Sequence, residues 1–439
     1  MSYSSLRATA IAVLLLFLCL ASSRVCAEIL TFKDILAAGL QNSFDSKIIR
    51  EEIGAAQATV AERQADYYPQ LSLRFGNEYV HVFDEDGDIV SVGDAIIADN
   101  ASGYKHSLIA TARYNLYDFG IRELSVASAR RQVHIAELQK QQSSLDIHKE
   151  LLTLYADSLK VQQRIRVIEV IAERQQTIFQ LSKKLHQAGT LGREQLGNAA
   201  LELAETLSQL EDLQTRWQNL LENLSFHTQE NYHAEDVTLA DFPQREKPEH
   251  VVNLESFPEV LIYQQQIETK QTELSMLKRS LLPRLTLSGS YRMFGSDDHS
   301  FTDSLSNLNS RDASMTLYLE CPIFDGFANR AKQTRTRHEL ASLRYRKQKK
   351  QAELQQELST TLNTYTASAS MEGERRKQLK RIAGQRSDVQ RLAEQQLTDR
   401  IAVHNHMIEL SRRQLDVDLR QVDYAASALL LALMNEVGS

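Results

Sequence analysis

The sequence predicts a mainly α-helical protein with a small membrane β part, organised as two similar halves. Three observations lead to this fold class. The same order of patterns occurs twice, each time over about half the chain; four short runs alternate apolar and polar residues; and the stretches after them are long and contain almost no glycine or proline. Self-similarity on this scale indicates a duplicated structural unit.

Residues 1–27 have the pattern of a secretory signal peptide. Arg7 supplies a positive start, residues 8–20 form an apolar core, and residues 25–27 carry small side chains before Glu28. The apolar core is too short for a membrane-spanning helix, so a retained anchor is the less favoured alternative. We therefore expect the mature chain to be exported.

The composition excludes several classes of function. Removal of the signal would take away Arg7 and Arg24 and change the formal net charge from −7 to −9, which argues against a nucleic acid partner. Cys321 would remain as a lone cysteine, which forms neither an internal disulfide nor a metal cluster. The sequence contains no glycine-rich phosphate loop, metal-ligand cluster or nucleophile motif. We expect a protein that is not an enzyme and uses no cofactor or metal.

Each half begins with a helix that leads into the alternating runs. Thr31 opens the first helix, predicted over residues 31–66, and Asp34 is placed to complete a capping box, although Glu or Gln is more usual there. The helix stops before Pro69, because proline disfavours a helical conformation in the preceding residue. A similar helix, predicted over residues 258–281, precedes Pro283 in the second half.

The alternating runs come in two pairs and predict β-strands. Half-buried strands of a soluble sandwich show the same alternation. Lengths of about ten residues, and aromatic side chains such as Tyr79 near the ends, favour strands with lipid on one face and water on the other. In an exported chain this indicates the outer membrane of a Gram-negative cell, which closed barrels span. The four predicted strands cover residues 71–81, 106–117, 285–293 and 313–321.

The loop between the first two strands is strongly acidic. Its Asp-Glu-Asp-Gly-Asp run, at residues 84–88, has oxygen ligands of the kind that calcium prefers. The run lacks the later glutamate that completes a calcium-binding loop. An acidic, solvated turn is therefore the favoured interpretation of residues 82–103.

Long helical hairpins follow each pair of strands, over residues 120–228 and 328–435. At about 1.5 Å per residue, their longest helices would reach about 100 Å. Gly189 and Gly192 interrupt the first hairpin, and residues 397–399 interrupt the second. On the return helix of the first hairpin, large apolar residues recur every seven positions and predict a coiled-coil seam. They are Leu196, Leu203, Leu210, Trp217 and Leu224.

The domain organisation follows from these elements. After the signal, the first structural repeat is predicted over residues 28–240 and the second over residues 257–439. A polar connector over residues 241–256, containing Pro243 and Pro248, separates them.

Four strands require several chains to complete a membrane wall. The smallest membrane barrels close with about eight strands. An open sheet would leave unpaired backbone groups in lipid, each at a cost of several kcal/mol. Two subunits would supply eight strands and three would supply twelve, and the larger barrel would leave room for an aqueous lumen. The long hairpins also need neighbours to bury their apolar seams.

Several duplicated motifs together point to a known family. They are Pro69 and Pro283 before the strands, the strand exits Tyr117–Gly120 and Phe324–Gly326, and the turn at Gly189 followed by Glu194-Gln195-Leu196. In these features the chain resembles the TolC-like outer-membrane efflux protein family (outer membrane factors), over essentially all of the sequence after the signal.

The resemblance implies an assembly. It implies a homotrimer with a twelve-stranded barrel in outer-membrane lipid and an α-barrel tunnel of long helical hairpins that projects into the periplasm. It implies a passive channel of a tripartite efflux or type I secretion system. A periplasmic membrane-fusion adaptor and an inner-membrane pump or ABC transporter would be its partners.

The same resemblance assigns adaptor docking to the two hairpin tips. The second tip departs from the family pattern because it has no glycine, which leaves its adaptor specificity open. The predicted docking residues are Gly189, Thr190, Leu191 and Gly192 in the first tip, and Leu397, Thr398, Asp399 and Arg400 in the second.

The resemblance also places a pore constriction just after the second tip. Relatives have carboxylates there, whereas this chain has His404 and His406, followed by Glu409. Two residues that are two apart on a helix do not share a face, so the histidines cannot both line the pore equally. A ring of histidines would bind a transition metal or, once protonated, repel cations. Ordinary surface histidines of a polar helix are the favoured interpretation.

Two other classes of protein are weighed against a channel. A periplasmic or surface coiled-coil scaffold without a pore would explain the heptads but not the four alternating runs placed identically in both halves. A monomeric binding protein is disfavoured because the sequence has no compact core pattern. The residues do not distinguish small toxic compounds from an unfolded secreted protein as the cargo.

Overall fold

The computed structural model describes residues 28–81, 91–92, 95–96, 103–243, 252–395 and 399–438. The predicted signal, most of the acidic loop, and residues 244–251 of the predicted connector lie outside these residues. The chain forms two compact units. Unit 1 contains Met1–Arg50, Gln139–Val260 and Lys350–Ser439; unit 2 contains Glu51–Leu138 and Leu261–Lys349. Each unit therefore combines segments from both halves of the sequence.

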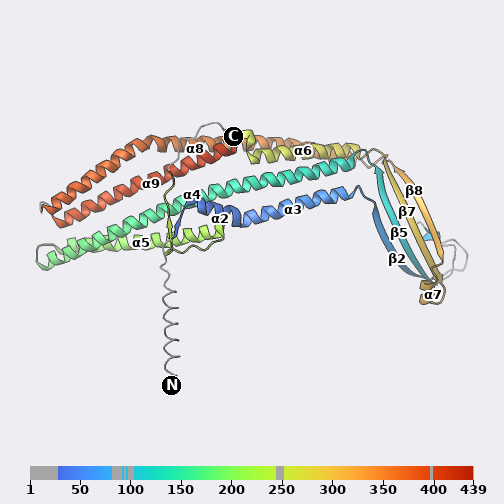
Figure 1. The fold of residues 1–439 in the computed structure, drawn as a ribbon, viewed down its shortest axis with the longest axis horizontal. Coiled ribbons are helices and arrows are strands. Elements are labelled where there is room, and N and C mark those ends of the chain that lie inside the picture. Colours follow the sequence, from blue (N-terminus) through green and yellow to red (C-terminus); the bar gives the residue numbers. More distant parts are fainter. Residues whose placement is uncertain are drawn as a thin grey trace, which may run out of the picture. The chain divides into compact units, whose positions relative to one another are not determined.

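The two halves follow one order of elements: a helix, two strands of one sheet, a long helix and a return helix (Figure 1). In the first half these are α3 (Phe44–Ala65), β2 (Gln70–Val80), β5 (Gly103–Tyr117), α4 (Ile121–Gln187) and α5 (Arg193–Thr228). In the second half they are α6 (Pro258–Arg279), β7 (Arg284–Asp297), β8 (Ser310–Glu320), α8 (Ala328–Glu394) and α9 (Arg400–Gly438).

The helix predicted over residues 31–66 is divided in the structure. Helix α2 (Phe32–Asn42) ends at Ser43, and α3 begins immediately afterwards. The Ser43 hydroxyl accepts a hydrogen bond from the Ser46 backbone N–H at 3.2 Å, so it caps the new helix. At the start of α2, both hydrogen bonds of the Thr31–Asp34 capping box are present. The short aspartate therefore reaches the position usually taken by glutamate.

The core of unit 1 holds the start of the chain and the connector against α4. Strand β1 (Glu28–Leu30) pairs in parallel with β6 (Val237–Leu239). The Gln162 side chain hydrogen-bonds both backbone groups of Leu239, at 2.8 and 3.0 Å. The Tyr155 hydroxyl lies 2.6 Å from the Ala240 carbonyl oxygen, and burial raises the pKa of this hydroxyl well above its usual range. A short 3-10 helix, η1 (Leu254–Ser256), precedes α6.

The heptad seam of α5 becomes more buried towards the end of the helix. Trp217 and Leu224 are buried in the core of unit 1, whereas Leu196, Leu203 and Leu210 are half-buried. Leu207, on a neighbouring stripe, is 49% exposed. No helix in the described part of the chain is long and apolar enough to cross a bilayer.

Unit 2 contains a four-stranded sheet in the order β2-β5-β7-β8, in which every neighbouring pair is antiparallel (Figure 1). Strands β5 and β7 are longer than predicted: β5 begins at Gly103 and β7 continues to Asp297. β2 and β8 are the edge strands. Two strands of two residues each, β3 (Ser91–Val92) and β4 (Ala95–Ile96), pair with each other in the acidic loop.

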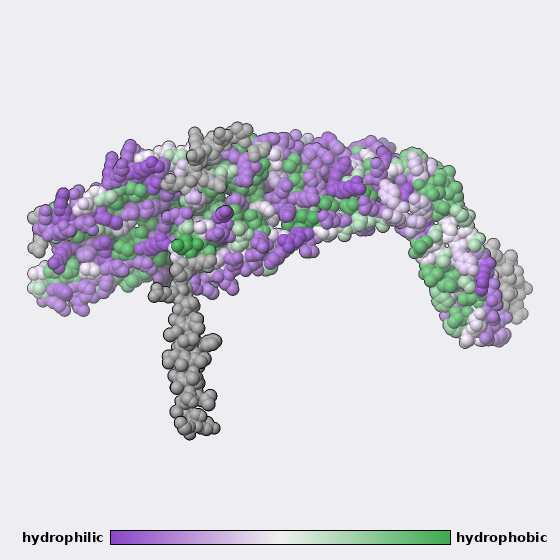
Figure 2. All heavy atoms as spheres, in the orientation of Figure 1, coloured by the Kyte–Doolittle hydropathy of each residue, from purple (hydrophilic) through white to green (hydrophobic). Residues whose placement is uncertain are grey.

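The register places most of the large apolar side chains of the four strands on one face of the sheet. Residues that lie directly opposite one another share a face. One row contains Leu71, Ala112, Gly289 and Met315, and the next contains Leu73, Ala110, Tyr291 and Ala313. Leu71 and Met315 are 79% and 76% exposed, and Figure 2 shows hydrophobic side chains at the surface of the strands. Around these two rows, the apolar face of the sheet therefore has no covering layer in the described part of the chain.

The segment between β7 and β8 contains a helix that was not predicted. Helix α7 (Phe301–Ser306) lies between β7 and β8 and packs on β5 and β7. Ser304 Oγ lies 2.7 Å from His106 Nδ1 and 2.8 Å from the Tyr104 carbonyl oxygen, and the Phe301 ring packs edge-on against His106. The helix thus buries His106 at the loop end of the sheet.

Candidate functional site

The second face of the sheet is polar. One row contains Ser72, Thr111, Ser290 and Ser314, and the Ser290 and Ser314 hydroxyls are 2.8 Å apart. The next row contains Arg74, Ile109, Arg292 and Asp312, and Arg292 Nε forms an ion pair with Asp312 Oδ1 at 2.7 Å. Apolar side chains on one face and polar side chains on the other are what a wall between lipid and water requires.

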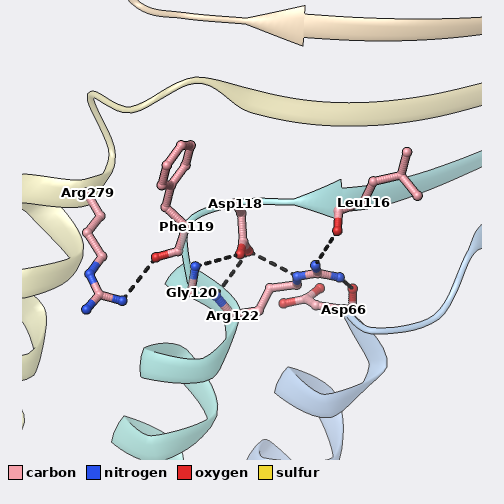
Figure 3. A network of polar contacts seen from close by, with 7 residues as sticks. All are labelled: Asp66, Leu116, Asp118, Phe119, Gly120, Arg122 and Arg279. Atoms are coloured by element: carbon pink, nitrogen blue, oxygen red, sulfur yellow. Dashed lines mark hydrogen bonds and ion pairs between the residues drawn. The ribbon is translucent and has the colours of Figure 1, made fainter.

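A polar network fixes the direction of the chain where β5 ends and α4 begins (Figure 3). The buried Asp118 carboxylate accepts hydrogen bonds from the backbone N–H groups of Gly120 and Arg122, both at 3.1 Å. It also forms an ion pair with Arg122 Nε at 3.0 Å. A carboxylate at this position is favourable because the first N–H groups of a helix have no partners within the helix.

Two arginines tie this turn to neighbouring segments. Arg122 donates to the backbone carbonyls of Asp66 and Leu116, at 3.3 and 3.5 Å, and its guanidinium lies 4.8 Å from the centre of the Tyr67 ring. Arg279, from the end of α6, donates to the Phe119 carbonyl at 3.0 Å. Sequence reasoning singled out the Tyr-Asp-Phe-Gly turn but neither arginine, because their carbonyl partners are recognisable only in the folded chain.

The turn after β8 is built in the same way, except that its glycine and phenylalanine occur in the opposite order. Asp325 accepts a hydrogen bond from the Asn329 backbone N–H at 2.7 Å. Two left-handed residues follow each aspartate: Phe119 and Gly120 in the first exit, Gly326 and Phe327 in the second. Glycine adopts this conformation freely, whereas phenylalanine does so at a cost of about 1–2 kcal/mol. Each exit therefore contains one strained residue.

The first predicted docking tip is a tight turn that is open to solvent. Gly189 has φ +74°, and no heavy atom lies within 4 Å of the position its Cβ would occupy. The Gly189 N–H donates to the His186 carbonyl and the Thr190 N–H to the Leu185 carbonyl, both at 3.0 Å, which forms a Schellman motif. Residues 183–190 are exposed and Leu191 is half-buried. Gly192 precedes α5, and its N–H donates to Gln195 Oε1 at 3.1 Å.

The second predicted tip is described in part. Leu397 and Thr398 lie outside the described residues. Asp399 caps α9: its carbonyl accepts a hydrogen bond from the Val403 N–H at 3.0 Å, and its carboxylate accepts one from the Ile401 N–H at 3.4 Å. Arg400 is the first residue of α9 and is exposed. A capping aspartate thus starts the return helix where the first tip uses glycine.

The predicted constriction residues lie on two sides of α9. His406 and Glu409 are exposed and line a shallow pocket between α8 and α9, together with Asp388 and Arg413. Glu409 forms an ion pair with Arg413. His404 is half-buried, and its Nδ1 is buried without a hydrogen-bond partner. Burial and the positive charge of Arg174 on α4 lower the pKa of His404.

Within the described residues, no group of three or more His, Cys, Asp or Glu side chains gathers in a geometry that could hold a metal ion. The features that stand out are instead a sheet with one apolar face, one polar face and two open edges, and two long helical hairpins, the first of which ends in an exposed turn. Together they define the class of outer membrane channels.

The chain belongs to the outer membrane efflux protein family, whose model matches residues 37–228 and 253–396. No match was found among curated proteins. Several solved structures share the fold. CusC is 13% identical with a TM-score of 0.73, and the match covers 93% of this chain and 91% of that chain.

Two further structures give the same result. VceC of Vibrio cholerae is 13% identical with a TM-score of 0.70, covering 92% of this chain and 96% of that chain. The CmeC outer membrane channel of Campylobacter jejuni is 11% identical with a TM-score of 0.74, covering 93% and 85%. These similarities confirm the predicted fold class of long helical hairpins with a small membrane β part.

The Asp118 cap is expected to contribute measurably to stability. Asp118→Ala should lower the free energy of unfolding by about 1–3 kcal/mol, because two helix N–H groups and the Arg122 guanidinium lose a charged acceptor. Thermal denaturation of the detergent-solubilised protein measures this loss. Asp66→Ala is the matched control, since Arg122 contacts the backbone carbonyl of Asp66. Equal stability of the two variants would contradict the assigned role of the Asp118 carboxylate.

Stability should fall at acidic pH in a way that depends on His404. The folded protein lowers the pKa of this histidine, so the unfolded chain takes up a proton first as the pH falls below about 6.5. The free energy of unfolding therefore decreases as the pH falls from about 6.5 through the lowered pKa, and the loss remains at lower pH. Melting temperatures from pH 8 to pH 5 should decrease less in His404→Gln than in the unchanged protein. The melting temperature of His406→Gln, on the exposed side of α9, should fall as much as that of the unchanged protein. Identical curves of melting temperature against pH for all three proteins would refute His404 as the origin of the pH dependence.

Proposed function

We propose that this protein is the homotrimeric outer-membrane channel of a tripartite efflux or type I secretion system. The observation that carries the proposal is the sheet of unit 2, which has one exposed apolar face and two open edges. In lipid, the unpaired backbone groups of β2 and β8 need hydrogen-bond partners. A second copy of the chain offers them.

Strand directions allow such a closure. Three successive antiparallel pairings make β8 run opposite to β2. β8 of one copy can therefore pair with β2 of the next in the antiparallel manner found throughout the sheet. Three copies close a barrel of twelve strands, with the apolar rows facing lipid and the polar rows facing an aqueous lumen.

The long hairpins fit the same arrangement. Each copy contributes α4 with α5 and α8 with α9, so three copies supply twelve helices for a tunnel on the periplasmic side. Apolar side chains that remain exposed on a single copy, such as Leu201 at 63% and Leu207 at 49%, are available for contacts with neighbouring chains. We place the barrel in the outer membrane and the tunnel in the periplasm, as expected if the predicted signal peptide exports the chain.

In this proposal the protein conducts and does not catalyse. The tips at Gly189–Gly192 and Leu397–Arg400 receive a periplasmic membrane-fusion adaptor, which connects the tunnel to an inner-membrane pump or ABC transporter. The solved relatives support the channel class, since CusC undergoes conformational changes that accompany transmembrane channel formation and CmeC is an outer membrane channel. Of the predicted constriction residues, His406 and Glu409 are exposed and so are available to line the lumen, whereas His404 is half-buried on another side of α9.

Cell fractionation separates the channel from a pore-free coiled-coil scaffold. The protein is expected in the outer membrane as a trimer that resists dissociation in detergent until it is heated. The reason is that interstrand hydrogen bonds between copies are protected from water in the barrel. Electrophoresis of heated and unheated membrane samples measures this. A soluble periplasmic pool of single copies would contradict the proposal and favour the scaffold.

Cross-linking tests the docking tip. In a Cys321→Ser background, Thr190→Cys should cross-link in whole cells to a periplasmic protein that mass spectrometry identifies as a membrane-fusion adaptor, because Thr190 is exposed at the tip. Gln355→Cys, exposed on α8, is the matched control and should give no such product. Equal adaptor cross-linking at both positions would refute docking at the tip.

A further inference from the structure

The polar face of the sheet carries more positive than negative charge. Over the described strands, its basic residues are Arg74, Lys105, Arg113, Arg284 and Arg292, and its acidic residues are Glu78, Asp312 and Glu320. This excess is notable because the whole chain is acidic, with a formal net charge of −7. The face proposed to line the lumen therefore has the opposite sign of charge from the protein as a whole.

Three of the basic residues have an acidic residue on the adjacent strand. Arg292 forms its ion pair with Asp312 at 2.7 Å. Glu78 lies directly opposite Lys105 in the β2–β5 register, and Arg284 lies directly opposite Glu320 in the β7–β8 register. Opposite charges at directly opposite positions stabilise a sheet and largely cancel each other's field.

Arg74 and Arg113 have no such compensation. Arg74 lies opposite Ile109, and Arg113 lies opposite Gln70 on one side and Ser288 on the other. Both side chains are exposed, and neither forms an ion pair within the described part of the chain. Their levels are separated by four residues of β2, which corresponds to about 13 Å along the strand.

We infer that Arg74 and Arg113 give the channel a preference for anions, so that anionic solutes are the cargo it passes most readily. This inference rests on the proposed trimeric channel, in which each arginine would occur three times around the lumen. Two rings of guanidinium groups, about 13 Å apart, would attract carboxylate and phosphate groups and repel cations.

Ion selectivity of the purified trimer in a planar lipid bilayer tests the inference. Under a potassium chloride gradient, the reversal potential of the unchanged channel is expected to have the sign of chloride preference. Arg74→Gln with Arg113→Gln should reduce the chloride-to-potassium permeability ratio several-fold. Asp312→Asn should raise the ratio, because it removes the negative partner of Arg292.

Arg311→Gln is the matched control. Arg311 belongs to the same sheet, but the register places it in the row of Phe75, Leu108 and Met293, on the apolar face. Its replacement removes one positive charge from the apolar face of the sheet instead of the polar face, and it should leave the permeability ratio unchanged. Since residues 82–90, with their acidic run, are common to all the variants, differences between the variants isolate the two arginines.

The outcomes separate the inference from the proposed function. If the trimer conducts but prefers potassium, the inference is overturned and the proposed channel function is not. The same holds if the chloride-to-potassium permeability ratio does not change when the two arginines are replaced. A folded trimer that conducts no ions at any applied voltage overturns the channel itself, and the inference with it.

Discussion

The need of the two edge strands for hydrogen-bond partners is the constraint on which the rest of this structure depends. β2 and β8 each present one row of backbone groups that no strand within the sheet satisfies. In water such an edge is tolerated, whereas in lipid each unsatisfied group costs several kcal/mol. The exposed apolar rows beginning at Leu71 and Met315 make lipid the medium that suits this sheet. In the proposed channel, the chain is therefore complete only when copies share their strands.

The two strand exits show how the chain passes from sheet to helix. Asp118 and Asp325 occupy equivalent positions and cap the long helices through the backbone N–H four residues later. Both turns need two consecutive left-handed residues, and each supplies one glycine and one phenylalanine in opposite order. The exposed rings of Phe119 and Phe327 lie at the end of the sheet, where aromatic side chains are favoured at a membrane interface. We interpret the backbone strain as the cost of keeping an aromatic ring at each exit.

The two hairpin tips provide hydrogen-bond partners for the backbone groups at their helix ends in different ways. The first tip reverses the chain with Gly189 in a Schellman motif, and its carbonyl groups find partners within the turn. At the second, the return helix is started by the Asp399 side chain. On α9, one side carries His406 and Glu409 next to α8, while Ile408 on another side joins the apolar cluster of α4 and α5. His404 and His406 are two residues apart on α9 and therefore lie in different surroundings.

The sequence by itself determined the order of the main helices and sheet strands, the two-faced strands and the turn at Gly189, because periodicity and the special conformations of glycine and proline are local properties. It indicated one apolar and one polar face for each strand before any register was known. Only the tertiary structure decided which strands are neighbours, where Arg122 and Arg279 find their carbonyl partners, and that α7 buries His106. It also showed that Arg74 and Arg113 lack opposite charges while Arg292 has one. These contacts join residues far apart in the chain, so the pattern along any one segment does not contain them.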